Sequence, residues 1–195
     1  NGHSSKWNSQ PLINAMPAGN LLVSAAILFS GNTYTNINSF SNFCGLPIIS
    51  ETKFYDIEKQ YLWPTVNNTW TTYRNDEIKE AKRSPSIDIC GDGRADSPGH
   101  NAKHGTYSVM DESSGKILDF QVVQVSEASS SNAMEPEGCN RCLNTLLKSG
   151  VKVRCLATDR HTTVSSNMRK LYPSIIHQYD AWHLSKWGYE KAFKK

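Results

Sequence analysis

With 195 residues, the chain is long enough to bury a real core, and one domain with a helical appendage is a reasonable organisation. The net charge of +3 is mild for a nucleic-acid enzyme, and it is unevenly spread. Residues 1–80 hold 5 Lys and Arg against 6 Asp and Glu, whereas residues 81–195 hold 16 Lys and Arg against 12 Asp and Glu. The sequence contains no recognisable signal peptide, membrane-spanning segment or low-complexity tract, which speaks against a secreted, membrane or disordered protein.

Residues 1–83 are expected to form a separate helical region. An apolar run too short to span a bilayer predicts the first helix, and Ser50 is a suitable cap for the third. Three short helices followed by a fourth are compatible with a helix-turn-helix unit that binds DNA, and equally with a bundle that packs on a catalytic domain. The third helix is not basic, which favours the bundle. The four predicted helices cover residues 21–29, 35–43, 51–62 and 64–83.

Residues 84–195 show the pattern of a mixed α/β domain. Apolar and polar residues alternate up to Asp92, as in a strand with one buried face, and a stretch rich in Ser, Ala and Asn over 126–133 predicts a loop. After it, apolar residues at helical spacing predict a helix with Pro136 in its first turn and Gly150 just past its end. The remaining predictions are strands over 86–92, 105–110, 116–125, 151–159 and 175–179, a helix over 163–171, and a helical tail from Ala181.

This order of elements, βββαβαβα, matches the ribonuclease H-like fold, in which an antiparallel meander is followed by strands joined through crossover helices. The fourth strand of that topology lies beside the first. Asp92 and Asp159, each at the end of one of these strands, would therefore be adjacent. Paired carboxylates at strand ends are how metal-dependent phosphoryl-transfer enzymes hold divalent ions.

The cysteines allow two interpretations. Cys139 and Cys142 form a Cys-x-x-Cys pair that could bind zinc with His177 and His183, but both lie on the apolar face of the predicted helix, and there is no second pair. We therefore favour buried structural thiols. An odd total of five cysteines also favours a reduced cytosolic or nuclear protein.

Three motifs carry a resemblance to a known family. They are Asp92-Gly-Arg-Ala-Asp-Ser-Pro-Gly-His-Asn-Ala-Lys103, Thr158-Asp-Arg-His161 and Tyr179-Asp-Ala-Trp-His-Leu-Ser-Lys186. Together they resemble the catalytic core of eukaryotic cut-and-paste DDE/D transposases, and within these the Kolobok-like group. The resemblance covers roughly residues 10–187, and the motif around Asp92 is its most distinctive part.

The resemblance implies a two-metal phosphoryl-transfer site that cleaves DNA and transfers strands. Asp92 matches the first metal-binding aspartate and Asp159 the second, and the implied cofactor is Mg²⁺ or Mn²⁺. Asp180 and His183 match a motif downstream of the second aspartate. His183 would contact DNA or order the scissile phosphate, and Asp180 would orient His183, act as a further ligand, or cap a helix. The candidates for nucleic-acid contact are Arg94, Arg160, His161 and Lys186.

The family also implies a nuclear protein that binds transposon ends, with a homo-oligomer possible and no membrane association. Three departures from the family pattern lead us to expect an inactive fragment. No Glu or Asp matches the third catalytic acid on a late helix, no THAP-type zinc finger is present, and residues 188–195 do not look like the family's continuation. The open alternatives are a non-enzymatic, domesticated DNA-binding remnant and an unrelated ribonuclease H-like nuclease. The nuclease would need a third carboxylate from Asp180 or Asp96.

Overall fold

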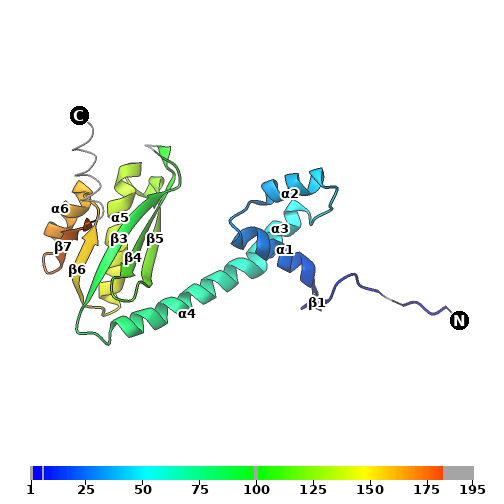
Figure 1. The fold of residues 1–195 in the computed structure, drawn as a ribbon, viewed down its shortest axis with the longest axis horizontal. Coiled ribbons are helices and arrows are strands. Elements are labelled where there is room, and N and C mark those ends of the chain that lie inside the picture. Colours follow the sequence, from blue (N-terminus) through cyan, green and yellow to red (C-terminus); the bar gives the residue numbers. More distant parts are fainter. Residues whose placement is uncertain (1, 6, 99–100, 182–195) are drawn as a thin grey trace. The chain divides into compact units, whose positions relative to one another are not determined.

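The computed structural model describes residues 2–5, 7–98 and 101–181, and the chain divides into two compact units, residues 1–71 and 72–195 (Figure 1). The division falls inside helix α4, Trp63–Ala81. Residue 83, the boundary expected from the sequence, lies just after the end of this helix. No helix within the described ranges is both long and apolar enough to cross a membrane.

The first unit is helical, as predicted. A short hairpin of β1, Leu12–Ile13, and β2, Met16–Pro17, precedes the helices. The Ser50 hydroxyl caps α3 by accepting a hydrogen bond from the Lys53 amide at 3.4 Å, and a π-helical turn then joins α3 to α4 without a break. Whether this unit is a helix-turn-helix stays a prediction. The helices are α1, Ala18–Phe29; α2, Tyr34–Phe43; α3, Glu51–Ile57; and the π-helix η1, Glu58–Leu62.

The second unit contains a five-stranded mixed sheet in the order β5-β4-β3-β6-β7. Strands β3, β4 and β5 form the antiparallel meander, and β6 and β7 add in parallel on the other side of β3. This is the predicted ribonuclease H-like order, and all five strands end within three residues of their predicted ends. The strands are β3, Ile87–Ala95; β4, His104–Asp111; β5, Ile117–Gln124; β6, Val153–Thr158; and β7, Ile176–Tyr179.

Besides its part of α4, the second unit contains two further α-helices among the described residues. Helix α5, Ser131–Lys148, follows the short 3-10 helix η3, Val125–Glu127, and packs against β4, β5 and β3; α6, Thr162–Leu171, joins β6 to β7. The prediction that Pro136 lies in the first turn of α5 is wrong, because the helix begins at Ser131, inside the expected loop over 126–133, and Pro136 lies in its second turn. Proline costs a helix only the amide hydrogen bond it cannot donate plus steric strain, and here tertiary packing outweighs that cost.

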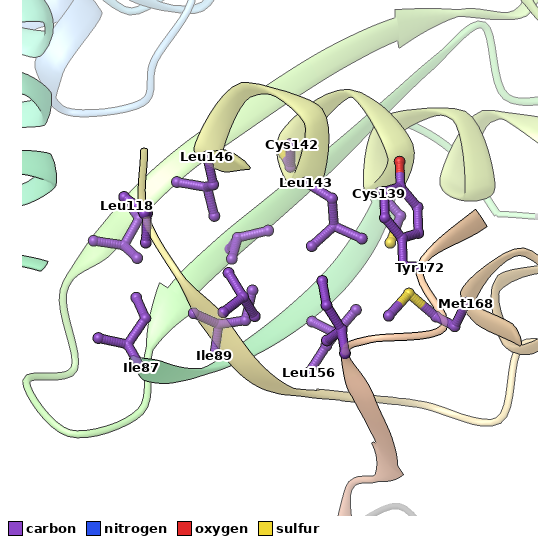
Figure 2. Packing of buried hydrophobic residues seen from close by; sticks show 14 of the residues in the cluster. Ile87, Ile89, Leu118, Cys139, Cys142, Leu143, Leu146, Leu156, Met168 and Tyr172 are labelled. Carbon is purple, nitrogen blue, oxygen red and sulfur yellow. The ribbon is translucent and has the colours of Figure 1, made fainter. Parts of the chain in front are cut away.

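The core of the second unit lies between α5 and the sheet (Figure 2). Leu143 and Leu146 of α5 are fully buried against Leu156 of β6 and other strand residues. Cys139 and Cys142 are buried in the same cluster, and the Cys142 thiol lies 3.6 Å from the Tyr107 carbonyl oxygen. Both cysteines are therefore buried, as the interpretation as structural thiols requires.

The packing of α5 generates a stability prediction. Leu143→Ala should lower the free energy of unfolding by about 2–5 kcal/mol, because it leaves a cavity under the helix. Leu147→Ala, four residues on, removes a side chain that is 39% exposed and should change it by no more than about 0.5 kcal/mol. Urea denaturation followed by circular dichroism measures both. Equal losses for the two variants would contradict the placement of α5.

Candidate active site at the ends of β3 and β6

The parallel pairing of β3 with β6 brings the two predicted aspartates to one edge of the sheet. The paired residues end with Cys90 opposite Ala157, and Asp92 and Asp159 each follow two residues later. Asp92 lies inside β3, which continues to Ala95 beside β4, so the predicted strand end at Asp92 is three residues too early. Asp159 directly follows β6. Both residues line one cavity of about 240 Å³.

Each of the two carboxylates is held by a neighbouring backbone amide. Asp92 Oδ1 accepts a hydrogen bond from the Gly93 amide at 2.9 Å, and Asp159 Oδ1 accepts one from the His161 amide at 3.0 Å. Within the part of the chain that the structure describes, neither carboxylate forms an ion pair. Two acids with fixed orientation and no cationic side chain as partner are suited to a metal ion.

Asp180 lines the same cavity as Asp92 and Asp159. Its backbone amide donates a hydrogen bond of 2.8 Å to the Thr158 carbonyl oxygen, which ties the residue after β7 to the end of β6. Asp92, Asp159 and Asp180 therefore line one cavity. His183 and Lys186 lie outside the described residues.

The basic candidates are spread around this edge. Arg94 and His161 line a second cavity, of about 220 Å³. His161 is also the N-cap of α6, where its Nδ1 accepts a hydrogen bond from the Val164 amide at 3.4 Å. The Arg160 guanidinium lies over the Tyr179 ring, 5.9 Å from its centroid. Arg94 and His161 thus share a cavity, whereas Arg160 contacts β7.

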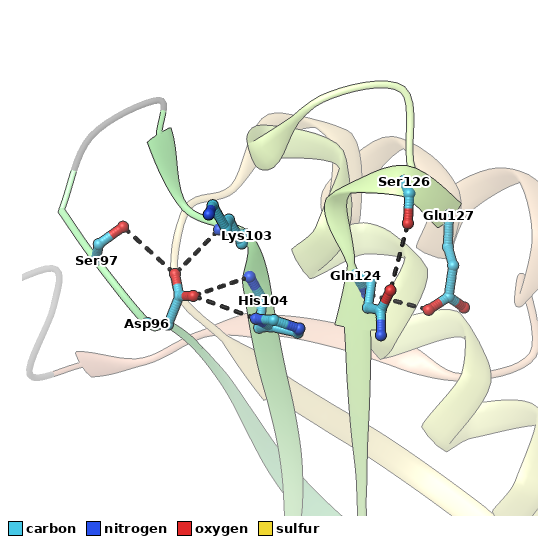
Figure 3. Close-up of polar contacts among 7 residues, drawn as sticks. All are labelled: Asp96, Ser97, Lys103, His104, Gln124, Ser126 and Glu127. Carbon is cyan, nitrogen blue, oxygen red and sulfur yellow. Dashed lines mark hydrogen bonds and ion pairs between the residues drawn. The ribbon is translucent and has the colours of Figure 1, made fainter.

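Asp96, the other acid considered from the sequence, holds the turn between β3 and β4 (Figure 3). It accepts hydrogen bonds from the Lys103 and His104 amides at 3.1 and 3.2 Å, and its Oδ2 lies 3.3 Å from His104 Nδ1. Burial opposes ionisation, but these hydrogen bonds hold the pKa of Asp96 below its usual value. Asp96 lines neither of the two cavities described above, so we assign it a structural role.

The structure adds an acid that the sequence did not point to. Glu135, in the second turn of α5, packs against Gly93 so closely that a Cβ at Gly93 would lie 2.7 Å from the Glu135 Cγ. Burial, and then the negative charges of Asp159 and Asp92, raise the pKa of Glu135 to about 7. Glu135 therefore lies near both aspartates, and it lines the cavity that contains Arg94 and His161.

The spacing of residues on α5 could have revealed Glu135. It precedes the buried residues Cys139 and Cys142 by one and two helical turns, so it lies on the face of the helix that meets the sheet. An acid on the apolar face of a helix is unusual and deserves a functional explanation. The sequence analysis followed the helical spacing only from Cys139 onward, however, and so did not include Glu135.

The donor set fits a hard divalent cation only in part. Among the residues that the structure describes, no three His, Cys, Asp or Glu side chains lie close enough together to form a complete metal site. Magnesium ions are commonly bound through one or two carboxylates, with water and substrate phosphates as the other ligands. Asp92 and Asp159 fit this incomplete mode of binding.

No family model matches the sequence, and no curated protein matches it. A solved structure described as the Drosophila P element transposase strand transfer complex is similar, with 14% sequence identity and a TM-score of 0.41. The match covers 96% of this chain and 44% of that one, so this chain spans less than half the length of its match. Membership of the Kolobok-like group stays a prediction.

The raised pKa of Glu135 predicts a pH-dependent cost to folding. The usual pKa of this side chain is 4.5, and the folded value is about 7, so the folded state retains a proton that the unfolded chain releases between these values. Stability is therefore lost as the pH rises from 4.5 through 7. Glu135→Gln should remove this loss. The amount by which the free energy of unfolding of Glu135→Gln exceeds that of the wild type should therefore be larger at pH 8 than at pH 4.5, by on the order of 1 kcal/mol. Urea denaturation at both pH values tests this, and an unchanged difference would contradict it.

Proposed function

We propose that this chain is a DNA transposase-derived protein whose second unit carries a site for metal-dependent phosphoryl transfer on DNA. The observation that supports this most is that Asp92 and Asp159 line one cavity, just beyond the parallel pairing of β3 with β6 in a ribonuclease H-like sheet. The motifs around both residues add the transposase resemblance, with the Kolobok-like group as its finer form. The chemistry would be cleavage of a DNA phosphodiester and strand transfer.

Asp92 and Asp159 are the proposed ligands of Mg²⁺ or Mn²⁺. When bound, such ions activate an attacking oxygen and stabilise the leaving oxygen of a phosphodiester. The carboxylates themselves stay oriented by the Gly93 and His161 amides, which lowers the reorganisation needed on binding. Asp180, in the same cavity, is proposed as a further ligand or as the residue that orients His183.

Basic residues near the two aspartates are the proposed contacts for the DNA substrate. Arg94 and His161 line the neighbouring cavity and are proposed to bind backbone phosphates of DNA, with Arg160 and Lys186 as further contacts. His183 is proposed to contact the scissile phosphate. Transposon ends are the expected DNA, and the same resemblance suggests a nuclear protein for which a homo-oligomer is possible.

The test is cleavage of plasmid DNA in Mn²⁺, with the 195-residue chain and with the same chain extended by whatever its transcript encodes at either end. Asp92→Asn and Asp159→Asn should each lower the cleavage rate by at least about a hundredfold, because removing a metal ligand forfeits several kcal/mol of transition-state stabilisation. Asp88→Asn, on the same strand, should cleave as the wild type does, since Asp88 pairs instead with Arg154 at 2.7 Å.

The outcomes of this assay distinguish a transposase from the two alternative functions. Joined DNA products support a transposase, and hydrolysis without joining would support a ribonuclease H-like nuclease instead. DNA binding without cleavage by either chain would support the non-enzymatic remnant. Cleavage that persists in Asp92→Asn or Asp159→Asn would overturn the proposed metal site.

A further inference from the structure

The first unit contains a long segment without a charged side chain. Residues 7–50, which include the β1–β2 hairpin, α1 and α2, hold no Asp, Glu, Lys, Arg or His. Surfaces that bind the DNA backbone gain most of their affinity from Lys and Arg, so this segment is poorly suited to contact phosphates. The face that it presents to solvent therefore fits an uncharged partner surface.

The same segment exposes large apolar side chains on both of its helices. Helix α1 buries Ile27, yet Leu22 and Phe29, two turns apart, are 70% and 66% exposed. In α2, Phe40 and Phe43 lie one turn apart and are 62% and 95% exposed. A helix that is apolar on its outer as well as its inner face is typical of a buried position, so α1 lacks a cover on its outer face.

The end of α2 gathers three of these side chains. Gly45 has a positive φ of 66°, which lets the chain turn back so that the Leu46 amide donates a hydrogen bond of 2.8 Å to the Ser41 carbonyl oxygen. In this capping motif the residue after the glycine commonly packs on the last turns of the helix. The motif therefore joins Leu46, which is 58% exposed, to Phe40 and Phe43 in one apolar patch.

We propose that the apolar face of the first unit, made of Leu22, Phe29, Phe40, Phe43 and Leu46, binds the same face of a second copy of the chain. A two-fold interface brings a surface against its own copy, and a face without charges can pair in this way without repulsion between like charges. Full burial of the five side chains would remove on the order of 600 Å² of apolar surface per copy. Two copies would bury about 1,200 Å², the size at which specific interfaces begin.

The small core of the first unit gives this contact a second role. Its buried apolar residues in the described ranges form two clusters, one of Met16, Ile57 and Leu62 and the other of Ile27, Tyr34 and Phe54. The second unit buries a much larger single cluster. Units with few buried apolar residues are marginally stable alone and are commonly completed by oligomerisation. A second copy would thus extend the core of the first unit.

The experiment is sedimentation velocity on the 195-residue chain without DNA or divalent ions. The wild type should be dimeric at about 100 µM, since an interface near the lower size limit binds in about the micromolar range. Phe43→Asp should raise the dimer dissociation constant at least about a hundredfold, because each copy loses an aromatic anchor and gains a carboxylate at the buried contact. Phe29→Asp should act in the same direction. Leu171→Asp is the matched control, because Leu171 is 59% exposed but lies on α6 of the second unit, and its dimer should equal that of the wild type.

The salt dependence of the wild-type dimer supplies a second readout that needs no variant. Association through an uncharged face should not weaken between about 0.1 and 0.5 M NaCl, whereas association through charged side chains would be screened. The inference is overturned by a monomeric wild type, by a dimer that dissociates at the higher salt concentration, or by a dimer that persists in both Phe43→Asp and Phe29→Asp. None of these results bears on the proposed metal site, because the assay contains neither DNA nor a divalent ion.

Discussion

The parallel pairing of β3 with β6 is the constraint on which the candidate site depends. Residues 87–95 and 153–158 are separated in sequence by the whole of β4, β5 and α5, and only this pairing aligns their carboxyl ends. Parallel neighbours require a crossover connection, and α5 supplies it. The burial of α5 against the sheet therefore stabilises the connection that leads to β6, and the pairing of β6 with β3 brings Asp92 and Asp159 to one cavity.

Two glycines of β3 allow other side chains to pack closely against this edge of the sheet. At Gly91 a Cβ would collide with the Tyr107 hydroxyl, and at Gly93 with Glu135. Alternating positions on β3 thus let one buried aromatic residue and one acid approach the backbone on either side of Asp92. Glycine lowers the intrinsic stability of a strand, so its presence at both positions indicates that close approach matters more here than strand propensity.

The sequence predicted the topology well because the strands and helices of the second unit have clear periodicity. Ile87 and Ile89 alternate with polar residues, and Leu143 and Leu146 repeat at helical spacing. The aspartates followed from their positions at strand ends. Glu135 did not, because the helical spacing was followed only from Cys139 onward, whereas the actual start at Ser131 depends on packing against β4 and β5 that no local pattern encodes.

Buried apolar side chains and a buried acid on the same face of α5 have opposite effects on stability. The helix gains stability by burying its apolar face, yet its second turn carries on the same face an acid whose ionisation is suppressed by burial and by two neighbouring aspartates. Such a residue reduces stability near neutral pH in the absence of a cation, and a stabilising role would be served better by glutamine or leucine. The pKa of Glu135 and the close approach that Gly93 allows therefore describe one feature, an acid placed on the buried face of α5 at the expense of stability.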